Sequence, residues 1–547
     1  MTSSPRSAST RSSRSPRIWR RRWPASPRSF RPTLTALPGP AYPFPARWKV
    51  GSELNLIPRS AELPGDIQRP RYKVKLRPHF PSLEPPMSRV SPLLAGVVLL
   101  ACLCPAAIAA AVPRPEEFLG FVVGTDRRLA DYDQISTYFH ILDDASDRLE
   151  LLDIGDSVQG RDLWMAVISS PDNLANAARY RDIARKLADP RGLSAEEIEQ
   201  LVTEGKTIVL ITCNIHSTEI ASSQMAMELA WYMTVTDEEP WTRILDDVIL
   251  LLAPSINPDG QQMVVDWYRK HLGTEYEGGR MPWLYHHYAG HDNNRDWFML
   301  NLPETRAVNR VLYHDWFPQV YLDIHQMGST GPRMFVPPFQ DPIGVNIHPL
   351  IWRLTDLFGT EMAVRLQEDG RLGVIDGFAY DGYWPGGTMN TAWWKNVVGL
   401  LTESASVHMA TPLRIEKNEL RGGRKGLPDY RKQVNFPDPW PGGWWHLRDI
   451  VDYQIISNGS LLETAARYRE DLLRDMARMA QDAVQAGRSR APYAYLIPPE
   501  QRDAVTAARM IDILLENGVE VHRATAAFQV GTRSYAEGTL VVRMDQP

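Results

Sequence analysis

The feature that most constrains the fold is an apolar run over residues 208–213 that leads into the polar sequence Asn-Ile-His-Ser-Thr-Glu. A parallel strand that is buried on both faces is nearly continuous in apolar residues, and here a helical pattern over residues 221–233 follows. Ligands of open α/β sheets bind just beyond the carboxyl ends of such strands. His216 and Glu219 stand at that position, and both residue types are zinc ligands. This short pattern also recurs by chance, so it needs support from elsewhere in the chain.

Three further apolar runs each end in polar residues. They are residues 247–254 before Asn257, residues 317–324 before His325, and residues 397–402 before Glu403. Strands that alternate with helices predict an α/β fold with a mixed, mostly parallel sheet and helices on both faces. Because parallel strands end at the same edge of a sheet, the four polar ends are expected to be neighbours.

The charge distribution divides the 547-residue chain, which is too long for one compact core. Residues 1–86 carry 17 Lys+Arg against 4 Asp+Glu, net +13, whereas the chain from Val112 onward carries 42 against 61, net −19. The acidic excess of the part expected to fold argues against nucleic acid as a partner. We predict that residues 1–86 are a disordered or mis-annotated N-terminal extension. A transit peptide is the alternative, since such peptides are rich in Arg and Ser.

Residues 87–111 have the pattern of a secretory signal peptide. Arg89 supplies the positive start, residues 93–103 an apolar core, and residues 109–111 three alanines for cleavage before Val112. The core is too short for a confident membrane span, so we expect an exported protein, periplasmic or extracellular, with no stable span after signal removal. Cys102 gives a weaker lipoprotein alternative. Only Cys213 of the three cysteines would remain, which excludes a disulfide framework.

The periodicities after the signal divide the remaining chain into three predicted parts. We assign residues 112–460 to a catalytic domain and residues 461–490 to a connecting helix. Residues 491–547 form the start of a truncated C-terminal α/β domain, with strand patterns at 493–497, 519–522 and 539–544 around a helix at 499–516.

Five short motifs occur at or near these strand ends in a fixed order. They are His216-Ser-Thr-Glu219, Asn257-Pro-Asp-Gly260, Asn294-Arg295-Asp-Trp297, Asp323-Ile-His325 and Leu401-Thr-Glu403. Over roughly residues 120–410 this series resembles the zinc carboxypeptidases of the peptidase M14 family. The resemblance implies one Zn²⁺ per chain held by His216, Glu219 and His325, with Glu403 as the general base. Independently, two imidazoles and one carboxylate leave a coordination position open for water, which the metal acidifies.

The resemblance also implies residues that bind the substrate. Asn294 and Arg295 would hold its terminal carboxylate, and an arginine suits a carboxylate better than a lysine does, because it binds in a bidentate manner. Arg269 matches the arginine that stabilises the oxyanion. The segment between Arg269 and Asn294 is longer than is usual in the family. Arg280 is therefore the alternative candidate for the arginine that stabilises the oxyanion.

Specificity is expected to depend on the segment around residues 380–390. Tyr383 matches a mobile tyrosine that closes over the substrate, with Tyr380 as an alternative. Met389 or its neighbours Thr388 and Asn390 would lie at the base of the S1′ pocket; none is charged, which favours a hydrophobic or medium-sized C-terminal residue. Three histidines are expected at the cleft rim rather than in a second metal site: His286, His287 and His291.

Each site residue also has an ordinary structural interpretation. His216 and His325 are also compatible with core histidines, Glu219 with a helix-capping acid, and Glu403 with a paired buried carboxylate. Three functions follow for the whole set. The first is an exported zinc metallocarboxypeptidase that hydrolyses C-terminal peptide bonds of peptides with a free carboxylate. The second is a zinc-dependent deacylase of N-acyl amino acids, and the third a catalytically silent binding module, which the presence of all ligands and the base disfavours.

Overall fold

The computed structural model describes residues 54–56 and 112–547. The centre of the fold is an eight-stranded mixed sheet in the order β2-β3-β5-β4-β6-β11-β7-β9. The strands are β2 (Leu149–Asp156), β3 (Asp162–Ile168), β4 (Thr207–Cys213), β5 (Val248–Ala253), β6 (Val320–Met327), β7 (Met334–Phe335), β9 (Val374–Ile375) and β11 (Val398–Ala405). Strands β5, β4, β6 and β11 are mutually parallel. The predicted α/β fold with a mixed, mostly parallel sheet is confirmed.

Alternating side chains of the central strands enter two apolar cores on opposite faces of the sheet. In β4, Ile208 and Leu210 belong to one core, while Val209, Ile211 and Cys213 belong to the other. All seven residues of β4 are buried. This explains the unbroken apolar run in the sequence, because a strand covered on both faces has no solvent-facing side chains.

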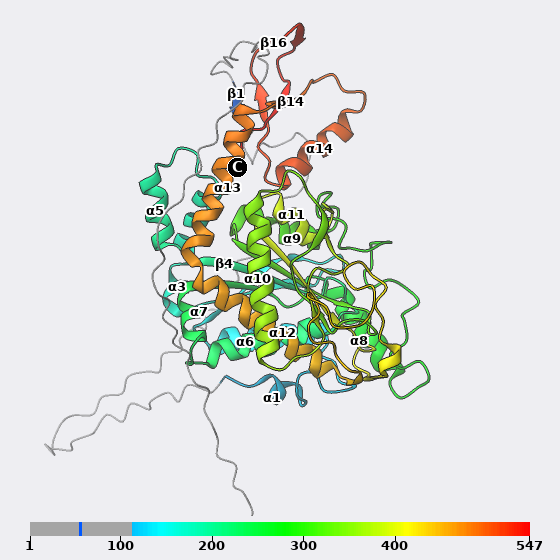
Figure 1. The fold of residues 1–547 in the computed structure, drawn as a ribbon. Helices are drawn as coiled ribbons and strands as arrows, with labels where there is room; N and C mark the ends of the chain where they lie inside the picture. The colour runs from blue at the N-terminus through cyan, green and yellow to red at the C-terminus, as the bar shows by residue number, and fades with distance from the viewer. Residues whose placement is uncertain (1–53, 57–111) are drawn as a thin grey trace, which may run out of the picture. The chain divides into compact units, whose positions relative to one another are not determined.

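Helices cover both faces (Figure 1). The larger core contains α2 (Tyr132–Ala145), α6 (Ala221–Val235), α8 (Pro258–His271), α10 (Pro349–Glu368) and α12 (Leu447–Arg467). The second core contains α4 (Ala177–Ala188), α9 (Pro303–Arg310), a π-helical turn η1 (Val311–Asp315) and part of α13 (Arg469–Ser489). The shorter helices are α1 (Pro115–Leu119), α3 (Pro171–Ala175), α5 (Ala195–Glu204), α7 (Trp241–Asp247), α11 (Thr388–Trp393) and the 3₁₀ turn η2 (Lys417–Glu419). Small strand pairs are β8 (Gln340–Ile343) with β10 (Asp381–Gly382) and β12 (Leu413–Ile415) with β13 (Gly443–Trp445).

The helical pattern over residues 461–490 spans two helices. Helix α12 begins at Leu447 and ends at Arg467, and α13 begins at Arg469 after a break at Tyr468. Helix α12 packs against α10 and α6, so it is part of the layer that covers the central sheet. The helical periodicity continues across the break, and for this reason the sequence pattern did not locate it.

Three C-terminal strands and the N-terminal strand β1 form a second, antiparallel sheet in the order β1-β15-β18-β14. Its strands are β1 (Leu54–Leu56), β14 (Ala494–Ile497), β15 (His522–Ala524) and β18 (Leu540–Arg543), with helix α14 (Ala504–Glu516) and the hairpin β16 (Phe528–Val530) and β17 (Arg533–Tyr535). Apart from β1, the predicted extension and signal peptide lie outside the described residues. None of the helices in the described ranges combines the length and the hydropathy of a membrane span.

Candidate metal centre

The strand order places the predicted site residues on neighbouring elements. His216 lies in the loop after β4, His325 in β6 and Glu403 in β11. The parallel register pairs Glu403 directly with His325, and the last residue of β4 pairs with Ile324. The sequence placed His325 and Glu403 just after their strands, whereas both strands continue past them.

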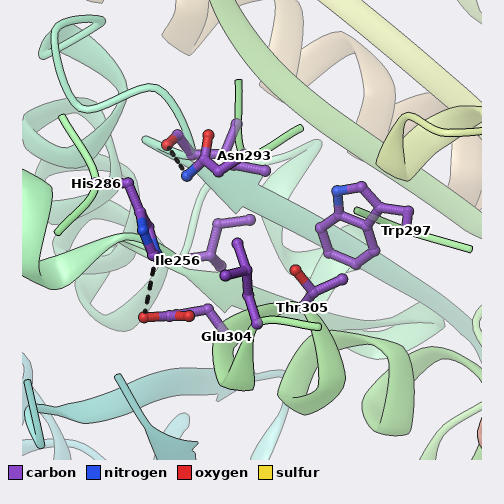
Figure 2. Close-up of a pocket in the computed structure, with 8 residues that line it drawn as sticks. Ile256, His286, Asn293, Trp297, Glu304 and Thr305 are labelled. Atoms are coloured by element: carbon purple, nitrogen blue, oxygen red, sulfur yellow. Dashed lines mark hydrogen bonds and ion pairs between the residues drawn. The ribbon is translucent and has the colours of Figure 1, made fainter. Parts of the chain in front are cut away.

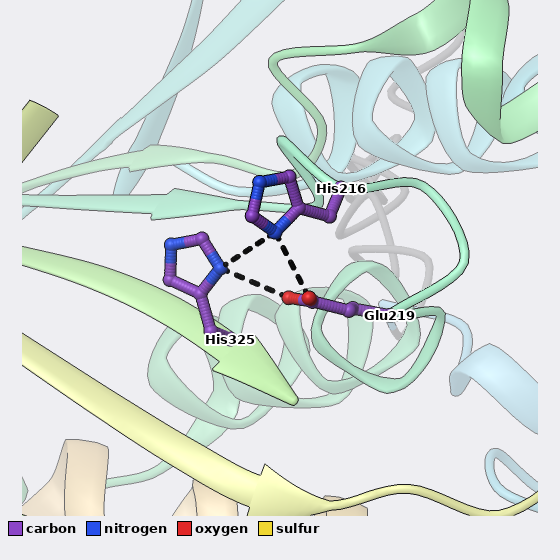
Figure 3. A group of neighbouring side chains, drawn as sticks. All are labelled: His216, Glu219 and His325. Carbon is purple, nitrogen blue, oxygen red and sulfur yellow. Dashed lines mark hydrogen bonds and ion pairs between the residues drawn. The ribbon is translucent and has the colours of Figure 1, made fainter. Parts of the chain in front are cut away.

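His216, Glu219 and His325 converge on one point, as Figure 3 shows. Nδ1 of His216 lies 2.9 Å from Oε1 of Glu219, and Nδ1 of His325 lies 3.0 Å from Oε2. The two Nδ1 atoms are 3.2 Å apart. Tetrahedral zinc with ligands at about 2.0–2.1 Å separates its donor atoms by about 3.3 Å, so the three donors fit that ion closely. No second group of three metal-ligating side chains occurs in the described part of the chain.

Two aspartates hold the outer nitrogens of these imidazoles. Nε2 of His216 lies 2.8 Å from Asp292 Oδ1, and Nε2 of His325 lies 2.6 Å from Asp323 Oδ2. A carboxylate at Nε2 keeps the proton there and leaves the Nδ1 lone pair for a metal. Sequence reasoning assigned neither aspartate a role. The contact of Asp323 with His325 could have been predicted from the sequence, because residues two apart in a strand point to the same face. Asp292 lies in a loop, where no such periodicity indicates which way a side chain points.

The Asn-Pro-Asp-Gly motif supports the loop that carries His216. Asn257 donates from Nδ2 to the Ile215 carbonyl (2.9 Å) and accepts at Oδ1 from Gly260 N–H (3.1 Å). A Cβ at Gly260 would overlap the carbonyl oxygen of Tyr285 and Oγ of Ser217. Only glycine therefore permits this close approach of α8 to the loop.

Asn294 and Arg295 differ in their surroundings. The buried Asn294 amide donates to Asp323 Oδ2 (3.2 Å) and accepts from Thr388 N–H (2.9 Å), so it is occupied by contacts within the protein. The Arg295 side chain is 48% exposed, and Nη2 lies 3.1 Å from Asp292 Oδ2. Of the two predicted carboxylate-binding residues, Arg295 is the one that remains open to a ligand.

Glu403 is buried beside the cluster, and burial raises its pKa to about 7 against the opposing effect of His325. The Tyr380 hydroxyl hydrogen bonds to Glu403, and this contact lowers the pKa of the carboxyl. The ring centroids of Tyr380 and Phe335 are 4.7 Å apart. Phe335 in β7 is the register partner of Glu403 in the neighbouring strand β11. Tyr380, an alternative at the sequence level, is therefore the tyrosine that contacts Glu403 here.

We expect Tyr380→Phe to move the acidic limb of the pH profile of kcat/KM to higher pH. The substitution removes the hydrogen bond that stabilises the ionised Glu403 carboxylate, so the pKa of Glu403 rises. The pH dependence of peptide hydrolysis by the two proteins measures the shift. Tyr495→Phe is the matched control, because Tyr495 is 57% exposed and lies in β14, outside the site. If the acidic limb of the pH profile did not move in Tyr380→Phe, Tyr380 would not influence the ionisation of Glu403.

Arg269 is engaged on the N-terminal side of helix α2. Its Nη1 lies 2.6 Å from Asp131 Oδ2, and its Nη2 donates to the Leu129 carbonyl and to Gln134 Oε1, both at 2.9 Å. These contacts hold the guanidinium in this conformation, so the oxyanion role stays a prediction for Arg269 and for its exposed rival Arg280. Met389 is 7% exposed and packs within the larger core, at the start of α11.

The negative charge of Glu219 and the positive charges of His216 and His325 stabilise one another. Burial disfavours ionisation of Glu219, but His216 and His325 lower the pKa of its carboxyl to about 2. Burial also disfavours the His216 imidazolium, yet Glu219 and Asp292 raise the pKa of His216 to about 9. The pKa of His325 is raised well above its ordinary value, against burial, by Asp323 and Glu219. Without a metal, the positive charge that Glu219 requires is supplied by protons on the two imidazoles.

Residues 136–330 match the family model described as zinc carboxypeptidase, Peptidase_M14. No curated protein matches the chain. The chain is similar to solved structures of carboxypeptidase A from Helicoverpa armigera (15% identity, 66% of this chain and 80% of that one, TM-score 0.37) and of a metallo-carboxypeptidase from Burkholderia cenocepacia (14%, 61% and 69%, TM-score 0.38). A third is a metallo-carboxypeptidase from Pseudomonas aeruginosa in complex with (2-guanidinoethylmercapto)succinic acid (16%, 63% and 69%, TM-score 0.37).

Proposed function

We propose, from the premise that residues 136–330 belong to the zinc carboxypeptidase family, that this chain is an exported zinc metallocarboxypeptidase. The chain is a zinc carboxypeptidase-like hydrolase, and the proposal adds its substrate, mechanism and location. The observation that carries it is the convergence of three metal-ligating side chains, one of which, His325, pairs with the buried carboxylate Glu403 on the adjacent strand. Glu403 lies outside the matched segment, so its role is argued from geometry and burial.

The three donors His216, Glu219 and His325 would hold one Zn²⁺ per chain. When bound, zinc supplies Lewis-acid chemistry that acidifies water and polarises a carbonyl group. Glu403 accepts a proton from the attacking water and returns it to the nitrogen of the leaving residue. Asp292 and Asp323 keep both imidazoles in the tautomer that ligates through Nδ1.

Arg295 would bind the terminal carboxylate of a peptide. We expect Arg295→Ala to lower kcat/KM for peptides with a free C-terminus by about 10- to 100-fold, because a hydrogen bond to a charged group contributes about 1.5–3 kcal/mol. The loss should occur mainly in KM. The same peptides with an amidated C-terminus are the control, since they offer no carboxylate. Equal losses on both substrates would contradict the assignment.

Zinc binding should strengthen as pH rises, because the metal must displace protons from His216 and His325. Below the raised pKa of His216, about 9, each displaced proton changes the apparent affinity by about tenfold per pH unit. We therefore expect at least a tenfold gain per unit between about pH 6 and pH 9. Competition with a chelator of known affinity, corrected for the chelator's own protonation, measures this. A pH-independent affinity would contradict the protonated state of the cluster.

The function is tested with the full chain expressed in an exporting host. We expect about one zinc per chain, release of C-terminal residues from blocked dipeptides, and a secreted product that begins at Val112. Hydrolysis of N-acyl amino acids without hydrolysis of peptides would replace the carboxypeptidase by the deacylase. A preference for Lys or Arg at the C-terminus would contradict the uncharged S1′ base expected around Met389.

A further inference from the structure

The loop that carries Arg295 continues directly into a short turn, residues 296–302 (the 296–302 turn). The buried Asp296 carboxylate closes this turn, because its Oδ2 accepts from the backbone N–H groups of Asn301 and Leu302, both at 2.8 Å. Arg295 therefore lies at the start of a hydrogen-bonded unit, and a movement of the 296–302 turn reaches its backbone.

The base and the tip of the 296–302 turn have different surroundings. At the base, Trp297 is buried, and Figure 2 shows its indole across a small internal pocket from His286. His286 is thus buried and does not lie at the cleft rim, where the sequence predicted it. At the tip, the side chains of Phe298 and Met299 are 44% and 40% exposed. Because exposed side chains contribute little packing, the backbone of the tip depends mainly on hydrogen bonds.

Helix α14 and the residue that follows it supply hydrogen bonds to this tip. Asn517 donates from Nδ2 to the Phe298 carbonyl (3.3 Å), and Arg509 donates from Nη2 to the Leu300 carbonyl (3.4 Å). Arg306 in α9 also donates to the Leu300 carbonyl (2.7 Å). Leu300 has a φ of 52°, a left-handed conformation that a leucine adopts only where its surroundings hold it. The tip of the turn is therefore held from outside.

Asn517 also contacts a second segment of the substrate site. Lys395, which follows helix α11, donates from Nζ to Asn517 Oδ1 (2.8 Å), so the amide turns its Nδ2 to the Phe298 carbonyl. Helix α11 contains Met389. Asn517 thus joins the loop of Arg295 to the segment expected to form the base of the S1′ pocket.

The end of α14 is anchored well enough to support the turn. The carbonyl oxygen of Glu516, the last residue of α14, accepts from Asn309 Nδ2 (2.6 Å) and lies 2.7 Å from His314 Nε2. The last carbonyl groups of a helix have no partner within the helix, so donors from α9 and η1 satisfy this one. Asn517 follows immediately and has a defined position relative to these elements.

We propose that Asn517 is a positioning residue for Arg295; this role rests on the proposed carboxypeptidase function. Asn517 holds the 296–302 turn, and the turn fixes the position from which Arg295 binds the terminal carboxylate of the substrate. Without this hydrogen bond, Arg295 has more freedom in the free protein, and ordering it on binding costs affinity. The zinc donors and Glu403 are not affected.

Hydrogen exchange of the full chain, followed by mass spectrometry, tests the structural step. We expect Asn517→Ala to speed exchange of the backbone amides in the 296–302 turn. The matched control is Asn176→Ala. Asn176 donates to the carbonyl four residues earlier, that of Asp172 (2.8 Å), as Asn517 does to that of Ile513 (2.9 Å), but it lies outside the substrate site. Unchanged exchange in folded Asn517→Ala would overturn the proposal, whether or not the protein hydrolyses peptides.

Steady-state kinetics test the step from the turn to Arg295. Asn517→Ala should raise KM about 3- to 10-fold for peptides with a free C-terminus. The value of kcat, the zinc content and the KM for amidated peptides should stay unchanged. In an Arg295→Ala background the same substitution should have no further effect, because both changes act on one interaction. Additive losses, or equal losses on free and amidated peptides, would overturn the proposal.

Two further outcomes are distinguishable. If Asn517→Ala fails to fold, Asn517→Asp replaces it with the same expectations, because aspartate keeps the acceptor for Lys395 but offers no donor to the Phe298 carbonyl. A wild-type protein that hydrolyses no peptide would overturn the proposed function and with it the role of Asn517 in substrate binding. Faster exchange in the variant would still show that Asn517 holds the turn.

Discussion

Glu403→Gln is expected to abolish peptide hydrolysis while the chain keeps its zinc. Glutamine has nearly the same shape but cannot accept the proton of the attacking water, and general acid–base catalysis contributes about 10²–10⁴ in rate. Because Glu403 is not one of the three donors that converge at the metal centre, metal content should stay near one per chain. Steady-state kinetics with blocked dipeptides, alongside metal analysis of the same samples, measures both quantities.

The matched control for this substitution is Glu368→Gln. The Glu368 side chain is 62% exposed and pairs with the exposed Arg365 at 3.4 Å, so its loss should leave kcat unchanged. A Glu403→Gln enzyme that keeps more than about a tenth of wild-type kcat would show that another group moves the proton. Loss of zinc in the same variant would instead show that Glu403 helps to hold the metal.

The folding pattern and the metal centre were predictable from sequence for one physical reason. Parallel strands buried on both faces are apolar throughout, so each strand end is visible as the point where polar residues begin. His216, His325 and Glu403 stand at or near such points, and the strand order β4-β6-β11 makes them neighbours. Strand order itself is not encoded in local periodicity, so the sequence predicted that the polar strand ends are neighbours but not the order of the strands.

Contacts made by irregular loops were not predictable in this way. The stretch from Leu272 to Leu302 has no strand or helix, so its side-chain directions depend on the path of the loop. Asp292 thereby reaches His216, and His286 turns inward to Glu304 instead of lining the cleft. The engagement of Arg269 with Asp131 is likewise a contact between segments distant in sequence, which no local pattern reports.

The second large effect is expected for His325→Ala, which should remove both the zinc and part of the stability. The substitution deletes one of three metal donors and also leaves the Asp323 carboxylate, which is fully buried, without its imidazole partner. Removing one partner of a buried ion pair costs about 3–5 kcal/mol, because the other charge stays buried and uncompensated. Zinc content should fall to near zero, and urea unfolding in the presence of chelator should give a lower free energy of unfolding than for the metal-free wild type.

The double substitution His325→Ala with Asp323→Asn separates the two consequences. It removes the uncompensated charge, so part of the lost unfolding free energy should return while zinc binding stays absent. His140→Ala, on the exposed side of α2, is the control for losing a histidine outside the site. If the double variant were no more stable than His325→Ala, the buried Asp323 charge would not be the origin of the destabilisation, and lost packing around His325 would explain it instead.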